Sequence, residues 1–167
     1  MADGPLVSLA ERVGERCLGL GIRIATVESC TGGLVGHLIT ETPGSSAYYV
    51  GGFITYADRS KQVMVGVPAE VLAAHGAVSA QTAIAMAAGG RSRTGAEICI
   101  SVSGIAGPDG GSPAKPVGLT YVAVVDADGA AVRRYVWAGS RAENKRSSAQ
   151  AALELALERI QETADRA

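Results

Sequence analysis

The residues most able to do chemistry lie in the stretch 26–33, with the sequence TVESCTGG. An apolar run over 22–27 leads into this stretch, and a helical pattern over 34–39 follows it. A strand that turns into a glycine-opened helix would hold the Ser29 hydroxyl near the positive end of that helix. Backbone N–H groups of such a turn can bind an anion or a developing oxyanion. The candidate groups for that role belong to Cys30, Thr31, Gly32 and Gly33.

A serine hydroxyl is a weak nucleophile unless a neighbouring base takes its proton. Neither histidine is well placed: His37 lies roughly 12 Å along the same predicted helix at 1.5 Å per residue, and His75 stands at a predicted helix end. The other candidates are Tyr56 and Lys61, which flank a predicted strand-to-helix turn. A desolvated lysine can act as a base, and a tyrosine can relay a proton. The spacing alone is also compatible with a solvated lysine and a tyrosine that only packs in a strand, so it does not identify the base for Ser29.

A second candidate region is the glycine- and proline-rich loop 104–118, which follows a strand that ends in Ser103. It has neither the Lys-Ser/Thr of a P-loop nor the glycine spacing of a dinucleotide fingerprint. Its backbone N–H groups, with Lys115, can still approach a phosphate or a carboxylate. Arg141 begins the last predicted helix, where a cation opposes the helix dipole. This conflict weakly indicates an anionic partner, although charges at a helix start are more often simply solvated. The candidate substrate contacts here are Ser103, Gly104, Gly107, Lys115 and Arg141.

These residues need elements that position them. Apolar periodicity predicts helices over 5–20, 31–40, 58–65, 68–75, 79–93 and 141–164, and strands over 22–27, 48–56, 96–103, 119–126 and 130–137. This order predicts an α/β fold: one three-layer α/β/α sandwich over 1–167 with a mixed, mostly parallel sheet of about five strands. Because ligands bind outside the carboxyl ends of strands in such sheets, we expect the turns after Val27, Ser103 and Tyr56 to meet.

Composition excludes several classes of function. The 167 residues are 47% apolar and 19% charged, with a net charge of −1. They contain no block of Lys and Arg residues that would indicate a nucleic-acid-binding groove. No run is long and apolar enough for a membrane span, and the start of the chain lacks a secretory signal. Three widely spaced cysteines indicate neither a disulfide framework nor a metal site. We therefore expect a cytoplasmic protein without metal, cofactor, nucleic-acid or membrane partners.

Five blocks together resemble the CinA C-terminal domain family. They are 28–33 (ESCTGG), 43–46 (PGSS), 51–56 (GGFITY) with Lys61, 76–79 (GAVS), and 103–108 (SGIAGP) with 115–118 (KPVG). The blocks occur in the family's order over nearly the whole chain. Two departures are Ser103, where the family usually has threonine, and Asp109, where it usually has glycine. Asp109 adds a negative charge to a loop expected to meet phosphate.

The resemblance implies a nicotinamide-nucleotide amidohydrolase, which hydrolyses nicotinamide mononucleotide (NMN) to nicotinic acid mononucleotide and ammonia. It implies a metal-independent mechanism with Ser29 as nucleophile and Tyr56 and Lys61 as base, an α/β/α fold and a homo-oligomer. Longer family members carry a further N-terminal domain, and we expect this chain to be the stand-alone form. Two alternatives stay open. One is a non-catalytic nucleotide-binding or regulatory module linked to competence or DNA damage, and the other is an amidase for a different small amide.

Overall fold

The computed structural model describes residues 3–166, and every predicted helix and strand has a counterpart in it. The main difference is at the second helix, which begins at Leu34 because residues 31–33 form a turn. In chain order the elements are α1 (Gly4–Leu20), β1 (Ile24–Glu28), α2 (Leu34–Thr40), the 3₁₀ turn η1 (Ser45–Ala47), β2 (Tyr49–Ile54), α3 (Asp58–Val65), α4 (Ala69–His75), α5 (Ala80–Thr94), β3 (Ile98–Gly104), β4 (Leu119–Asp126), β5 (Gly129–Val136) and α6 (Arg141–Arg166).

The strands of the described chain form one sheet in the order β2-β1-β3-β4-β5. β1 pairs in parallel with both β2 and β3, whereas β4 is antiparallel to β3 and to β5. The predicted mixed five-stranded sheet is therefore confirmed, but it is not mostly parallel as expected: two pairings are parallel and two are antiparallel, because β4 and β5 form a hairpin that pairs with β3 in the antiparallel direction. A hairpin joins β4 to β5, where Asp126 pairs with Gly129.

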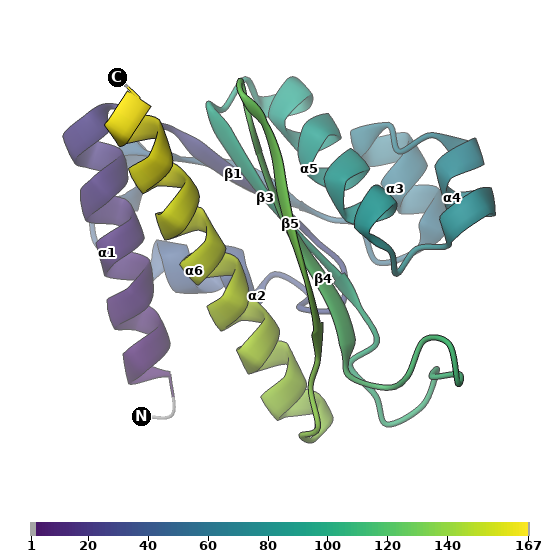
Figure 1. The fold of residues 1–167 in the computed structure, drawn as a ribbon. Coiled ribbons are helices and arrows are strands. Elements are labelled where there is room, and N and C mark those ends of the chain that lie inside the picture. The colour runs from purple at the N-terminus through teal and green to yellow at the C-terminus, as the bar shows by residue number, and fades with distance from the viewer. Residues whose placement is uncertain (1–2, 167) are drawn as a thin grey trace.

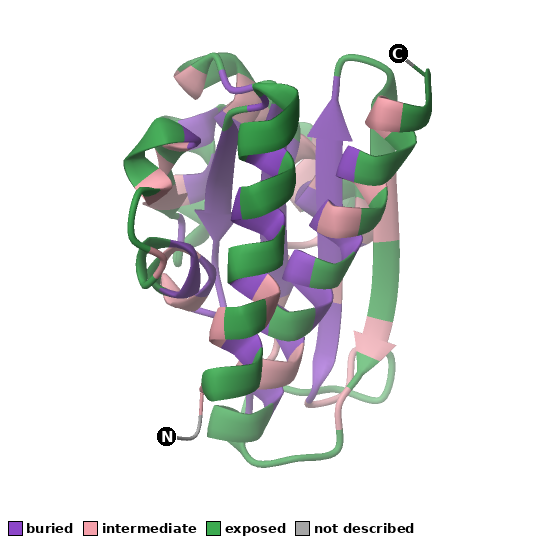
Figure 2. Cartoon of the chain, turned by 90° about the vertical axis from the view of Figure 1, so that its left-hand side faces the viewer, coloured by how far each residue is buried: buried purple, intermediate pink, exposed green. Residues whose placement is uncertain are grey.

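Helices cover both faces of the sheet, as Figure 1 shows: α1, α2 and α6 lie on one side and α3, α4 and α5 on the other. The larger apolar core lies beneath α1, α2 and α6, and a smaller one lies beneath α3 and α5. The outer faces of α1 and α6 are exposed while their inner faces are buried (Figure 2). This arrangement is the predicted α/β/α sandwich.

The glycine pair within α5 is explained by close packing. A Cβ atom on Gly89 would lie 1.7 Å from the carbonyl oxygen of Val65 in α3, and one on Gly90 would lie 2.3 Å from Val27 in β1. Two glycines lower helix propensity by about 1 kcal/mol each. Here they let α5 contact both α3 and the sheet.

The carboxyl ends of β1, β2 and β3 meet at one edge of the sheet, as predicted. The Ser29 N–H donates to the Val102 carbonyl at 2.9 Å, and the Thr55 N–H donates to the Glu28 carbonyl at 2.8 Å. Because β1 lies between β2 and β3, the turn at Ser29 is flanked by the segments that follow both neighbours. Within residues 3–166, none of the helices combines the length and apolar character needed to cross a bilayer.

Candidate active site

Glu28, the last residue of β1, holds the start of α2. Its side chain is buried, and Oε2 accepts hydrogen bonds from the N–H groups of Gly33 and Val35, each at 3.0 Å. Oε1 accepts a third from Gly36 at 2.8 Å. These N–H groups are the ones that a helix start leaves free, and the helix dipole favours a negative charge there. We did not predict this role from the sequence, although a carboxylate just before a glycine-opened helix was a usable signal.

The predicted anion site at Cys30 to Gly33 needs a correction, because half of its N–H groups are occupied. The Gly33 N–H donates to Glu28, and the Gly32 N–H donates to the Ser29 carbonyl at 3.0 Å. Both glycines have positive φ, 63° and 100°, which shapes the turn. Among the described residues, no backbone acceptor is found for the N–H groups of Cys30 and Thr31. These two are the remaining candidates for binding an oxyanion.

Lys61 contacts Ser29 directly. Its Nζ lies 3.2 Å from the Ser29 Oγ and donates to the carbonyls of Thr55 at 2.9 Å and Tyr56 at 3.3 Å. The side chain is only 1% exposed, and this burial lowers the pKa of Lys61 below its usual range. The exposed Asp58 carboxylate, 4.0 Å from Nζ, raises the pKa and partly opposes that effect. The arrangement brings a desolvated amine to a serine hydroxyl, which is what a serine nucleophile needs from its base.

Other candidate nucleophiles and bases are poorly placed. Burial raises the pKa of the Cys30 thiol to about 12, so this thiol stays protonated near neutral pH. His37 lies on α2 with its Nδ1 3.9 Å from Glu41, and both side chains are more than half exposed. His75 ends α4. Neither histidine lines the pocket at Ser29.

A pocket of about 250 Å³ opens above the Ser29–Lys61 pair. Its lining residues come from all the turns that were expected to meet: Ser29, Cys30, Tyr56, Asp58, Lys61, Ala77, Val78, Ser103, Gly104, Ile105, Ala106, Gly107, Asp109, Gly110 and Arg141. Thr31, Gly32, Gly33 and Lys115 are the predicted contacts outside this lining.

The Tyr56 side chain stands next to Arg141. Its hydroxyl accepts a hydrogen bond from Arg141 Nη2 at 3.0 Å, and Tyr56 is 61% exposed. Arg141 Nη1 donates to the Gly107 carbonyl at 2.8 Å, which ties α6 to the 104–118 loop. Tyr56 is therefore not placed between Lys61 and Ser29 as a proton relay. Lys61 contacts Ser29 directly, and the Tyr56 hydroxyl is hydrogen-bonded to Arg141 instead.

The 104–118 loop is held by contacts that the sequence did not indicate. Ser103 Oγ donates to the Ala77 carbonyl at 2.6 Å, so its hydroxyl joins β3 to the segment before α5. Asn144, a buried residue of α6, donates to the Ala106 carbonyl at 3.1 Å. Lys115 Nζ donates to the His75 carbonyl at 2.6 Å and does not line the pocket, so its predicted substrate contact gains no support from the structure.

Comparison with known proteins shows the family. The family model of the CinA C-terminal domain matches residues 6–160, which is most of the chain. The chain belongs to the CinA C-terminal domain family. The structure titled competence/damage inducible protein CihA from Agrobacterium tumefaciens resembles this CinA domain with a TM-score of 0.91 at 40% identity, covering 95% of this chain and 96% of that one.

Two relatives differ in how much of their length the CinA domain represents. The nicotinamide-nucleotide amidohydrolase PncC of Escherichia coli K12 is 43% identical over 155 residues, covering 92% of this chain and 94% of PncC. The CinA-like protein of Citrifermentans bemidjiense is 50% identical over 121 residues, covering 72% of this chain but only 29% of that protein.

The homo-oligomer and the cytoplasmic location stay predictions. No group of three or more His, Cys, Asp or Glu residues within 3–166 is placed to hold a metal ion.

Replacing Glu28 with glutamine is expected to destabilise this CinA domain by roughly 1–3 kcal/mol, because an amide N–H₂ would face a backbone N–H donor in a buried site. The free energy of unfolding in urea measures the effect. The exposed Glu41→Gln variant, at the other end of α2, is the control and should stay close to wild type. Equal stability of Glu28→Gln and wild type would contradict the role given to this carboxylate.

Proposed function

We propose that this chain is a nicotinamide-nucleotide amidohydrolase that hydrolyses NMN to nicotinic acid mononucleotide and ammonia. The observation that carries the proposal is the 3.2 Å contact between the buried Lys61 amine and the Ser29 hydroxyl in an open pocket. The substrate comes from the PncC relative, which matches nearly the full length of both chains. The serine–lysine pair supplies a nucleophile and a base for amide hydrolysis without a histidine.

The first step uses Lys61 in its neutral form. A neutral amine has two N–H groups and one lone pair; the N–H groups match the carbonyls of Thr55 and Tyr56, and the lone pair then faces Ser29. As Ser29 Oγ attacks the carboxamide carbon, its proton passes to Lys61 Nζ. The negative charge that develops on the amide oxygen is stabilised by the N–H groups of Cys30 and Thr31.

The second step breaks the carbon–nitrogen bond. Protonated Lys61 gives its proton to the amide nitrogen, and ammonia leaves with the bonding electron pair, so an ester to Ser29 remains. Water then attacks this ester while Lys61 takes its proton and returns a proton to Ser29 Oγ. The products are the free enzyme and the carboxylic acid, which loses its proton to ammonia or water and becomes the carboxylate. Arg141 and Tyr56 contact the substrate beside the reacting amide.

Ammonia release from NMN by the purified chain, with a chelator present, tests the proposed function. We expect turnover with NMN and weaker turnover with nicotinamide riboside and nicotinamide, because binding energy from the remote phosphate can orient the amide. Binding of NMN without ammonia release would instead indicate a nucleotide-binding or regulatory module. Equal turnover of all three compounds would indicate an amidase for small amides in general.

Replacing Asp58 with asparagine is expected to move the acid limb of the kcat/KM profile to lower pH. Asp58 raises the pKa of Lys61, so its removal lowers that pKa, and the active neutral amine persists at lower pH. The measurement is the pH dependence of ammonia release from NMN. Glu70→Gln, which removes an exposed acid from the neighbouring helix α4, is the control. A limb that moves to higher pH, or does not move, contradicts Lys61 as the base.

A further inference from the structure

Two carboxylates lie in the wall of the Ser29 pocket. Asp58 begins α3, which follows β2, and Asp109 lies in the 104–118 loop, which follows β3. The turn at Ser29 follows β1, and β1 lies between β2 and β3 in the sheet. The two carboxylates therefore approach the pocket from opposite sides of that turn. Both residues are exposed, so a ligand that reaches Ser29 enters between two acidic side chains.

Asp109 has none of the structural contacts that usually explain an aspartate in a turn. Such aspartates commonly accept hydrogen bonds from backbone N–H groups a few residues further on. Asp126 does so in the β4–β5 hairpin, where its Oδ1 accepts from the N–H groups of Asp128 at 2.8 Å and Gly129 at 3.1 Å. Asp109 lies in a Pro-Asp-Gly sequence that is typical of turns, yet within residues 3–166 its carboxylate forms neither such a bond nor an ion pair. Its carboxylate is therefore available to a ligand.

The cations in the pocket wall leave part of this negative charge uncompensated. Lys61 Nζ lies 4.0 Å from the Asp58 carboxylate, but this amine is neutral at the start of the proposed reaction. Arg141, the other cation in the lining, donates to a backbone carbonyl and to a phenol oxygen, which are neutral groups. Two carboxylates and one guanidinium then give the wall a net charge of −1.

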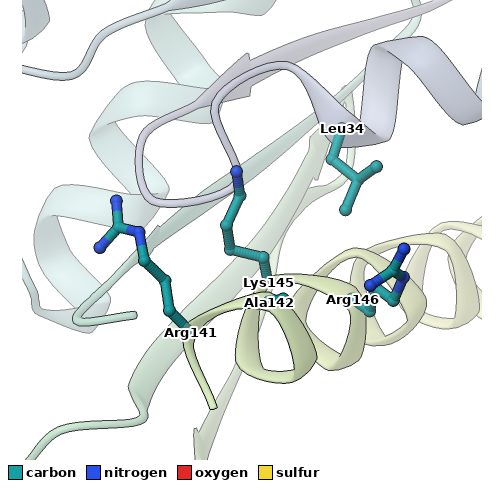
Figure 3. A pocket seen from close by; sticks show the side chains of 5 residues that line it. All are labelled: Leu34, Arg141, Ala142, Lys145 and Arg146. Atoms are coloured by element: carbon teal, nitrogen blue, oxygen red, sulfur yellow. The ribbon is translucent and has the colours of Figure 1, made fainter. Parts of the chain in front are cut away.

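The neighbouring cations of α6 do not change this balance. Lys145 and Arg146 line a separate pocket of about 390 Å³, which shares only Arg141 with the lining of the Ser29 pocket (Figure 3). The Lys145 amine extends towards the loop before α2, as Figure 3 shows. Arg146 is paired with Asp3, its Nε 2.8 Å from Oδ1. This positive charge belongs to the separate pocket, and the Ser29 pocket stays acidic.

The Ser29 pocket is small enough that a ring placed in it must lie against the acidic wall. Its volume is about 250 Å³. Pockets that hold a whole drug-sized ligand usually have roughly 300–1,000 Å³. The Ser29 pocket therefore has room for one aromatic ring with its carboxamide rather than for a complete nucleotide. When the carboxamide carbon meets Ser29 Oγ, the ring fills the remaining space beside Asp58 and Asp109.

Charge separates the rings that could occupy this space. In a nicotinamide nucleotide the ring nitrogen is bonded to ribose, so the ring is a pyridinium cation at every pH. Free nicotinamide and benzamides have neutral rings at neutral pH. A carboxylate beside the ring attracts the cation and has no such attraction for a neutral ring, and this difference is larger in a partly enclosed pocket than in bulk water. The acidic wall thus favours the charged ring.

We propose that Asp109, together with Asp58, pairs with a cationic ring and makes the Ser29 pocket selective for N-alkylated pyridinium carboxamides over neutral aromatic amides. Asp109 is the specificity-determining residue to test, because Asp58 also acts on Lys61. NMN as the natural ligand rests on the proposed function, whereas the preference for a cationic ring rests on the charges of the pocket.

The test compares Asp109→Asn with wild type, using two probes that differ in ring charge and hardly in shape. The first, 1-methylnicotinamide, carries the pyridinium cation, and the second, 3-methylbenzamide, has carbon in place of the charged nitrogen. Dissociation constants from NMR titrations need no turnover. Wild type should bind the cation roughly 3- to 10-fold more tightly than the neutral amide, as expected for a solvent-accessible charge pair. Asp109→Asn should lose most of this preference, and Asp109→Glu should retain it.

The matched control is Glu15→Gln, which removes an exposed acid from α1 and should leave the preference unchanged. A preference that survives in Asp109→Asn overturns the role of this residue. Equal affinities for the two probes in wild type, or binding of neither, overturns the cation preference altogether. An absence of ammonia release from NMN by wild type overturns the proposed function instead. In that case an Asp109-dependent preference for 1-methylnicotinamide still supports the acidic pocket.

Discussion

Replacing Ser29 with alanine is expected to lower kcat for ammonia release from NMN by at least about 10³-fold, because the variant has no side-chain oxygen to form the acyl intermediate. The Lys61 amine and the N–H groups of Cys30 and Thr31 remain in place, so substrate binding should persist. The measurements are steady-state ammonia release and the calorimetric Kd for NMN. A large loss of kcat with a nearly unchanged Kd is the expected combination.

The control for this variant is Ser46→Ala, which removes an exposed hydroxyl from η1, remote in sequence from the pocket residues. It should retain wild-type kcat and KM. If Ser29→Ala released ammonia at the wild-type rate, Ser29 would not be the nucleophile. If it failed to bind NMN while still folded, the hydroxyl would be a binding group, and the loss of rate would not identify a covalent step.

Local sequence patterns made Ser29 and Lys61 candidates, and the family resemblance paired them, but no local pattern predicted the distance between them. Ser29 was identified by the strand, the glycine pair and the helix around it, which are signals within ten or so residues. Lys61 lies 3.2 Å from Ser29 although the two are far apart in the chain. That distance depends on β1 and β2 pairing in parallel, which brings their carboxyl ends to one edge. The alternation of predicted strands and helices indicated a sheet with parallel strands but not the strand order, and the observed pairing makes the contact possible.

The site predictions that the geometry supports least concern side chains whose partners lie elsewhere in the chain. Lys115 turns to the His75 carbonyl, and the Tyr56 phenol is bonded to Arg141. Local patterns give the position of such a residue along the chain but not the direction of a long, flexible side chain. Glu28 was overlooked although its partners are local, since they are three backbone N–H groups at the start of the following helix. Apolar periodicity was sufficient to predict the helices and strands, whereas these side-chain contacts could be seen only in the packed structure.

Replacing Lys61 with methionine is expected to abolish activity, with kcat for NMN falling by at least about 10³-fold. Methionine has a similar length but cannot accept the Ser29 proton. Lys61→Arg should be equally inactive, because a guanidinium stays protonated and cannot act as a base. The matched control is Lys115→Met, which removes a lysine that lies outside the Ser29 pocket and should retain turnover. Activity in Lys61→Arg would show that a positive charge, and not a base, is what the site requires.

The Lys61→Met variant is also expected to change how the free energy of unfolding depends on pH. Burial holds the pKa of Lys61 in the folded protein below its ordinary value of 10.5. Between those two values the unfolded chain binds more protons than the folded one, so rising pH stabilises the wild-type protein through this group. Lys61→Met lacks that contribution, and the difference in unfolding free energy, wild type minus variant, should therefore increase as pH rises towards 10.5. Urea unfolding of both proteins over a series of pH values measures this difference, in which the other titrating groups largely cancel. A difference that stayed constant or decreased with pH would mean that Lys61 is not held towards its neutral form, and the proposed base would lose its physical support.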